Sequence, residues 1–126
     1  MLVVADSSPL IALINIGHID ILPQLFGTVI IPPAVGGELR DERRASAIRS
    51  FIGSSPAWLI ERTPKTIESF PLLDAGEVAA INLALEIKAD LLLIDESLGR
   101  RTAAARGIPI AGTIGIIERA AEQNLL

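Results

Sequence analysis

The fold is decided at residues 2–9, LVVADSSP, which open the chain after the first methionine. A short apolar run without alternating polar residues is typical of a parallel strand that is buried on both faces. Asp6 ends the run. The two serines then offer an N-cap, and Pro9 suits the first turn of a helix. A strand followed directly by a helix predicts the first unit of an α/β fold.

The same alternation of strands and helices continues to the end of the chain. We expect strands at residues 2–5, 28–31, 58–60, 91–94 and 108–111. We expect helices at residues 10–14, 19–26, 34–40, 43–52, 74–87, 96–106 and 113–124. This pattern predicts a three-layer α/β/α domain with four to five parallel strands joined by right-handed crossovers. Pro109 indicates an edge strand, and the absence of a linker predicts one domain over residues 1–126.

Composition limits the kinds of site that the chain can build. It has no cysteine and one histidine, His18, which excludes disulfides, Cys-ligated zinc and a conventional Ser-His-Asp centre. Any metal must be held mainly by oxygen ligands, which favours Mg²⁺, Mn²⁺ or Ca²⁺. No apolar run reaches the roughly 18–20 residues of a membrane span. The start also lacks the pattern of a signal peptide, so we expect a cytoplasmic protein.

Two of the expected strands end in the same way, with an apolar run followed by an aspartate. Asp6 follows the first strand and Asp95 follows the fourth. Because ligands of open parallel sheets bind outside the carboxyl ends of the strands, the two side chains converge if their strands are neighbours. Glu77, in the first turn of a helix, and Glu38, after the second strand, can join them. A divalent cation relieves the repulsion among such acids, and it can polarise a phosphoryl oxygen and activate water.

Four segments carry a resemblance to a known family. They are VVADSSPLI at residues 3–11, GEVAAI at residues 76–81, LLID at residues 92–95 with Arg100 shortly after, and GTIGII at residues 112–117. In this order they resemble a PIN-like branch of the PIN-domain family, related to the VapC-type toxin ribonucleases of prokaryotic toxin–antitoxin pairs. The resemblance extends over nearly the whole chain.

The resemblance implies an activity, partners and site residues. It implies a PIN-like fold and a Mg²⁺- or Mn²⁺-dependent endoribonuclease that acts as a toxin, with an RNA substrate, an antitoxin protein and a homodimer as expected partners. The four acidic positions of the family, expected to bind one or two ions, fall on Asp6, Glu38, Glu77 and Asp95. Three further residues are expected to orient water or phosphate: Ser7, Ser8 and Arg100.

The acids also have structural interpretations. Asp6 and Asp95 are placed to cap the helices that follow them. Asp74 and Glu77 have the spacing of a capping box. Glu38 by itself reads as a solvated helix residue. The paired glycines at residues 36–37 depart from the family pattern, which has firmer helix formers there; each glycine weakens a helix by about 1 kcal/mol relative to alanine. A catalytically silent PIN-like interaction module is therefore the alternative function.

The formal net charge of −4 is unfavourable for a nucleic-acid binder. Two arginine-rich stretches, at residues 40–49 and 100–106, are either a solvated face or the place where phosphates dock. Aromatic residues make up only 3% of the chain, so base stacking is poorly supplied. Trp58 is expected in the core.

A phosphoacceptor domain is disfavoured, because no Asp-x-Asp follows the first strand and no later strand carries a lysine.

Overall fold

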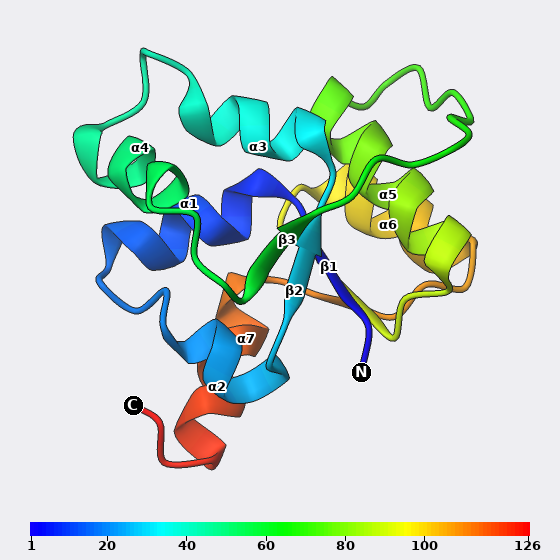
Figure 1. Cartoon of the computed structure of the whole chain (residues 1–126). Helices are drawn as coiled ribbons and strands as arrows, with labels where there is room; N and C mark the ends of the chain where they lie inside the picture. The colour runs from blue at the N-terminus through cyan, green and yellow to red at the C-terminus, as the bar shows by residue number, and fades with distance from the viewer.

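A five-stranded parallel sheet lies at the centre of the computed structural model, which describes residues 1–126 (Figure 1). Its strands are β1 (Val3–Ala5), β2 (Val29–Ile31), β3 (Leu59–Glu61), β4 (Leu91–Leu93) and β5 (Ile110–Ala111). Their order is β3-β2-β1-β4-β5, and every pairing is parallel. The predicted α/β fold with a parallel sheet is confirmed, and the strand that follows Pro109 lies at an edge.

Helices cover both faces of the sheet. They are α1 (Ser7–Asn15), α2 (Ile21–Phe26), α3 (Pro33–Arg40), α4 (Ser46–Gly53), α5 (Ala75–Ile87), α6 (Ser97–Ala105) and α7 (Thr113–Glu122). In Figure 1, α5 and α6 lie on one side of the strands, while α1, α2, α4 and α7 lie on the other, and α3 runs across the top toward α5. None of these helices combines the length and the apolar character needed to span a bilayer.

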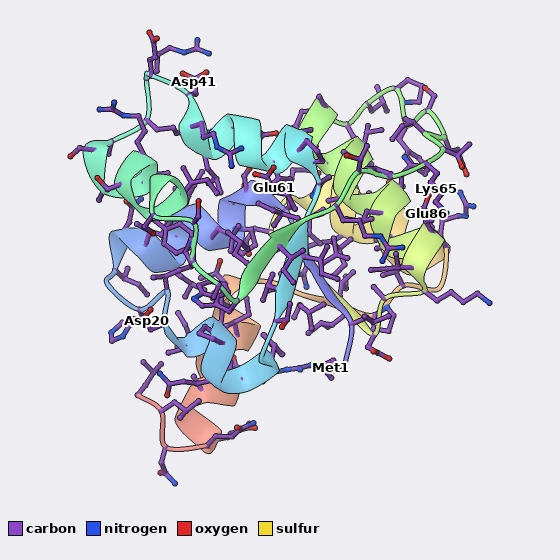
Figure 2. All side chains as sticks on the ribbon, in the orientation of Figure 1. Met1, Asp20, Asp41, Glu61, Lys65 and Glu86 are labelled. Atoms are coloured by element: carbon purple, nitrogen blue, oxygen red, sulfur yellow. The ribbon has the colours of Figure 1, made fainter.

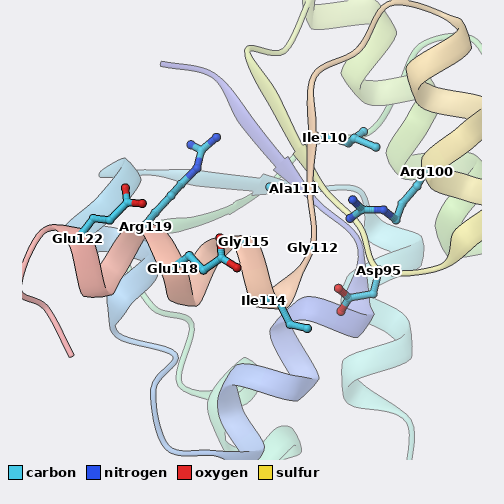
Figure 3. Close-up of a pocket in the computed structure, with 10 residues that line it drawn as sticks. All are labelled: Asp95, Arg100, Ile110, Ala111, Gly112, Ile114, Gly115, Glu118, Arg119 and Glu122. Carbon is cyan, nitrogen blue, oxygen red and sulfur yellow. The ribbon is translucent and has the colours of Figure 1, made fainter.

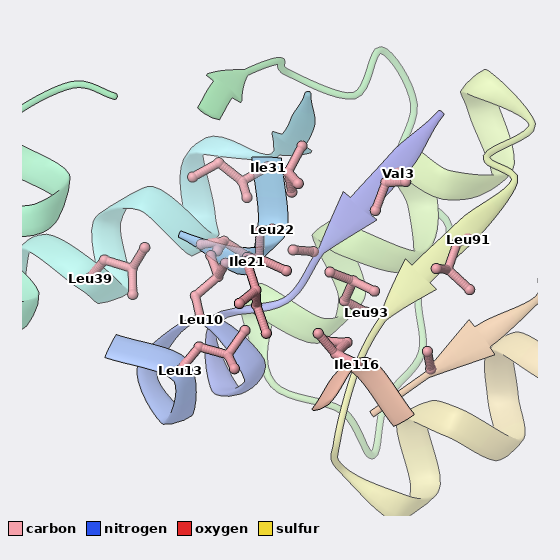
Figure 4. Packing of buried hydrophobic residues seen from close by; sticks show 14 of the residues in the cluster. Val3, Leu10, Leu13, Ile21, Leu22, Ile31, Leu39, Leu91, Leu93 and Ile116 are labelled. Atoms are coloured by element: carbon pink, nitrogen blue, oxygen red, sulfur yellow. The ribbon is translucent and has the colours of Figure 1, made fainter. Parts of the chain in front are cut away.

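The core is divided by the sheet into two apolar clusters. Val3 of β1 and Leu91 and Leu93 of β4 face α1 and α7, and Figure 4 shows them packed with residues such as Ile116. Val4, the residue between, faces α5 and α6. Because side chains alternate along a strand and helices cover both faces, each central strand must be apolar at every position. This requirement explains the uninterrupted apolar runs in the sequence.

Most predicted element boundaries differ from the observed ones by one or two residues, and the starts of α1 and α4 differ by three. The fourth helix begins at Ser46 rather than at residue 43, because the Asp41 side chain accepts hydrogen bonds from the Arg43 backbone N–H at 2.8 Å and from its guanidinium at 2.9 and 3.0 Å. This contact holds a turn between α3 and α4, with Asp41 at its tip in Figure 2. Helix α1 already begins at Ser7, so neither serine is its N-cap.

Candidate functional site

The carboxyl ends of β1 and β4 bring Asp6 and Asp95 to the same edge of the sheet. Ala5 lies opposite Leu93 in the parallel register. The Asp6 backbone N–H donates to the Leu93 carbonyl at 2.9 Å, which extends the pairing by one residue. The two strands are neighbours, as convergence of the two aspartates requires, but the side chains that follow have different surroundings.

Asp6 is a buried carboxyl group without a hydrogen-bond partner on one of its oxygens. The residue is 2% exposed, and its Oδ1 atom contacts no donor. It occupies the N-cap position of α1, yet its side chain makes no capping bond. The pKa of Asp6 is raised from its ordinary 3.8 to about 7, chiefly by burial and to a lesser extent by the nearby acids Glu38, Asp74 and Glu77, against a lowering by the backbone N–H of Ser7. The site therefore disfavours a bare negative charge at Asp6.

Glu38 reaches this region from α3 and is held from two sides. The buried Ser7 hydroxyl donates a hydrogen bond to Glu38 Oε2. The other oxygen, Oε1, lies against the backbone of Gly76 at the start of α5, because an added Cβ at Gly76 would fall 1.8 Å from it. Glu38 is thus not a freely solvated helix residue. Ser7, which was expected to contact substrate or water, gives its hydroxyl to Glu38.

Glu77 enters the site as part of a capping box. Its backbone N–H donates to Asp74 Oδ1 at 2.8 Å, and its Oε1 accepts from the Asp74 backbone N–H at 2.9 Å. Glu77 is 7% exposed, and burial raises its pKa, with Asp74, Glu96 and Glu38 adding to the effect. The predicted capping-box spacing is confirmed. It leaves Glu77 Oε2 without a hydrogen-bond partner in the protein, so capping and a site role are compatible.

Asp95 is exposed, and both of its oxygens are bonded to Thr113. Oδ1 accepts from the Thr113 backbone N–H at 2.7 Å, and Oδ2 accepts from its hydroxyl at 2.6 Å. The interpretation of Asp95 as the cap of the following helix was wrong. Glu96 caps α6 by accepting from the backbone N–H groups of Leu98 and Gly99. Asp95 instead caps α7, whose own N-cap residue, Gly112, has no side chain to do so.

Arg100 lies beside Asp95 at the rim of a hollow of about 630 Å³ between α6, β5 and α7 (Figure 3). Its Nη1 donates to the Ile94 carbonyl at 3.0 Å. Arg119 of α7 lines the same hollow. The lack of a side chain at Gly112 lets Arg100 and Asp95 both lie against its backbone, because a Cβ there would fall 2.7 Å from Arg100 Nη1 and 2.8 Å from Asp95 Oδ1. Arg100, predicted to orient water or phosphate, therefore lies next to Asp95 and faces this hollow.

A second hollow, of about 570 Å³, lies between the end of α3 and the start of α5. Its lining includes Glu38, Asp74, Arg43 and Arg44. Most arginines of the first stretch are bonded locally: Arg40 pairs with Glu61 at 2.6 Å, Arg43 pairs with Asp41, and Arg44 Nε donates to the Glu38 carbonyl at 3.1 Å.

Ser8 is exposed and forms no side-chain hydrogen bond. Trp58 is half-buried and packs on Phe51, with ring centroids 5.7 Å apart.

The donor set can be compared with the needs of a divalent cation. No three His, Cys, Asp or Glu side chains are gathered closely enough to hold an ion in the present arrangement. The chemistry of the donors nevertheless fits Mg²⁺ or Mn²⁺, which prefer carboxylate oxygens. Asp6 Oδ1 is buried and unbonded, Glu77 Oε2 is unbonded, and both share Glu38 as a charged neighbour.

Comparisons with known proteins agree with this architecture. The model of family DUF3368, described as a PIN domain, matches residues 2–126. No curated protein matches the sequence. Among solved structures, a PilT N-terminus domain protein from the hyperthermophilic archaeon Sulfolobus solfataricus superposes with a TM-score of 0.72, over 95% of this chain and 93% of that chain. The two sequences are 16% identical, so this likeness concerns the fold alone.

Proposed function

Because this chain belongs to the PIN-domain family, whose members are commonly metal-dependent nucleases, we propose that it is a Mg²⁺- or Mn²⁺-dependent endoribonuclease. The observation that carries the proposal is Asp6. A buried carboxyl oxygen without a partner is unfavourable by several kcal/mol when it is charged, unless a counter-charge is supplied. A divalent cation among Asp6, Glu38 and Glu77 supplies that charge.

The chain's own residues have distinct tasks in this proposal. Asp6, Glu38 and Glu77 bind the ion, which when bound supplies Lewis acidity toward the phosphoryl group and activates water. Ser7 fixes the Glu38 carboxylate, and Asp74 fixes Glu77 through the capping box. The guanidinium of Arg100 orients an RNA phosphate in the hollow beside Asp95, through charge-assisted hydrogen bonds.

The test is cleavage of labelled single-stranded RNA by the purified protein with Mn²⁺, with EDTA, and with the variant Asp6→Asn. We expect cleavage with Mn²⁺ and none in the other two reactions. Asp20→Asn is the matched control, because Asp20 is an exposed aspartate at the N-cap position of α2, labelled in Figure 2, and is not one of the site acids. Cleavage that persists both with EDTA and in Asp6→Asn contradicts the proposal and points to a contaminating nuclease or another centre.

We propose further that the protein is the toxin of a toxin–antitoxin pair, working as a homodimer and restrained by an antitoxin protein. The support is the resemblance of its ordered motifs to toxin ribonucleases. Induced expression in a bacterial host is expected to stop growth with the wild type and not with Asp6→Asn. Coexpression of a neighbouring small gene is expected to restore growth, and light scattering measures the oligomeric state. Normal growth with active wild-type nuclease contradicts the toxin role alone.

A catalytically silent interaction module is the second candidate. It is favoured by the two bonds between Asp95 and Thr113, which engage both oxygens of one of the four acids that the family resemblance assigns to the ion. It predicts no RNA cleavage and no change of melting temperature with Mn²⁺. A rise in melting temperature with Mn²⁺ that Asp6→Asn abolishes counts against it, because a ligand stabilises only the state that binds it.

A further inference from the structure

We propose that Gly76 is a positioning residue, whose lack of a side chain lets the Glu38 carboxylate lie at the start of α5 among the site acids. The inference rests on the proposed metal-dependent function and adds to it a requirement at a residue that carries no chemistry of its own. It concerns how Glu38 of α3 is accommodated against Gly76 of α5.

The contact between the two residues involves the whole carboxyl group. A Cβ added to Gly76 would fall 1.8 Å from Glu38 Oε1, 2.8 Å from Cδ and 3.2 Å from Oε2. Heavy atoms cannot approach this closely, so any side chain at position 76 must displace the carboxylate. By contrast, a Cβ at Gly37, the residue that precedes Glu38 on α3, meets no atom within 4 Å.

The backbone gives no other reason for glycine at this position. Gly76 lies in the first turn of α5, and it is not among the glycines with positive φ, which are Gly17, Gly27 and Gly107. Alanine is favoured over glycine within helices by up to about 1 kcal/mol. What glycine provides at position 76 is therefore space, and Glu38 occupies that space.

The displaced carboxylate cannot keep its other contact. Ser7 holds Glu38 Oε2 while Gly76 accommodates Oε1, so the group is clamped between α1 and α5. A methyl group at position 76 therefore prevents the carboxylate from keeping its present place between Ser7 and the start of α5. Because the group that moves is the end of a flexible side chain, the fold accommodates the change. Stability and metal affinity should therefore respond differently to the substitution.

The experiment compares Mn²⁺ affinity, measured by isothermal titration calorimetry, with the melting temperature in EDTA. Gly76→Ala is expected to weaken Mn²⁺ binding about 10- to 100-fold, the range for loss of a supporting contact around a metal ligand. The matched control Gly37→Ala, next to Glu38 but facing open space, is expected to bind as the wild type does. Both variants are expected to melt at or above the wild-type temperature in EDTA.

Two double variants show whether Gly76 acts through Glu38. In the Glu38→Gln background, Gly76→Ala is expected to cause no further loss of affinity. Gly76→Ala combined with Glu38→Asp is expected to bind more tightly than Gly76→Ala alone, because the shorter side chain makes room for the added methyl. A loss that is equally large in the Glu38→Gln background, or a Gly76→Ala protein that does not fold, overturns the inference.

The outcomes separate this inference from the proposed function. If the wild type binds Mn²⁺ and Gly76→Ala binds it equally well, the positioning role is overturned and the function stands. If the wild type binds no Mn²⁺, the function is contradicted, and a crystal structure of Gly76→Ala then decides the positioning role. A Glu38 carboxylate displaced from Ser7 supports that role, and one that stays bonded to Ser7 overturns it.

Discussion

Asp6 and Asp95 each follow the apolar run of one of two neighbouring strands, but they lie in opposite environments. Asp6 is buried with an unbonded oxygen, whereas Asp95 is exposed with both oxygens bonded to Thr113. The residue that follows each aspartate explains the difference. After Asp6 the helix α1 begins at once with Ser7, and the Asp6 side chain is buried. After Asp95 comes Glu96, which caps α6 and leaves Asp95 free to reach α7.

The two halves of the site also share a feature. Each contains a glycine that makes room for a charged group: Gly76 for Glu38, and Gly112 for Arg100 and Asp95. The buried half gathers acids whose charges are uncompensated and is suited to an ion. The exposed half combines an arginine with a hollow and is suited to substrate. The two halves are therefore suited to different ligands because they differ in burial, although both contain acidic residues.

The largest expected effect is a difference between Asp6→Asn and Asp95→Asn in the rate of RNA cleavage. Asp6→Asn should lower the rate of Mn²⁺-dependent RNA cleavage on the order of 1000-fold, because an ion's stabilisation of the transition state amounts to several kcal/mol. Asp95→Asn should lower it less than about tenfold, since its carboxylate is bonded to Thr113 and an asparagine remains a good cap. Single-turnover rates measure both. Equal losses would mean that the two acids act as one unit despite their different surroundings.

The next prediction concerns the stability of the metal-free protein as a function of pH. The pKa of Asp6 is raised by folding from 3.8 to about 7, so the folded state binds the proton more tightly than the unfolded state. The stabilisation is fully present below about pH 4 and is lost as the pH rises through 7. The loss is up to about 4 kcal/mol, since each tenfold change in proton affinity corresponds to about 1.4 kcal/mol. Urea unfolding in EDTA at pH 5 and pH 8 measures the part of this loss that falls between those two values, about 3 kcal/mol.

Asp6→Asn should remove most of this pH dependence and make the metal-free protein more stable than the wild type at pH 8. Asp95→Asn should leave the pH dependence in place, which makes it the matched control for the other half of the site. A wild-type stability that does not fall between pH 5 and pH 8 contradicts the unfavourable burial of a charged Asp6.

The third prediction compares the two serines that follow Asp6. Ser7 is buried and bonded to Glu38, whereas Ser8 is exposed and unbonded. Ser7→Ala should weaken Mn²⁺ binding about tenfold, because Glu38 loses the group that fixes it. Ser8→Ala should have no measurable effect. Calorimetric titration distinguishes them, and equal affinities for the two variants would show that the hydroxyl of Ser7 does not support the site.

Much of the arrangement was predictable because it depends on local patterns. The apolar run before Asp6 predicts a buried parallel strand, Pro109 predicts the edge, and the spacing of Asp74 and Glu77 predicts a capping box. Each of these was confirmed. The partners of the site side chains were not predictable. The bond of Ser7 to Glu38 joins residues 31 positions apart, and that of Asp95 to Thr113 joins residues 18 apart. Such contacts depend on how helices dock, which no local spacing encodes.

The smallest expected effect concerns the contact between the exposed Asp95 and Thr113, measured as a change in the free energy of unfolding. Asp95→Ala removes the group that caps α7 and should lower the free energy of unfolding by about 1 kcal/mol, the usual value for a lost N-cap. Thr113→Val removes the hydroxyl bonded to Asp95 Oδ2 and should have a similar or smaller effect, since a neutral donor to a carboxylate is replaced by a methyl group. Urea unfolding with and without Mn²⁺ measures both.

The capping contact lies outside the three acids that we assign to the ion, so these two losses should be the same with and without Mn²⁺. In Asp6→Asn, by contrast, the stabilisation that Mn²⁺ gives the wild type should disappear. A loss in Asp95→Ala that grows with added Mn²⁺ would mean that Asp95 leaves Thr113 when the ion binds. The exposed aspartate would then belong to the same metal site as the buried one, and the difference between the two strand ends would be a property of the metal-free state only.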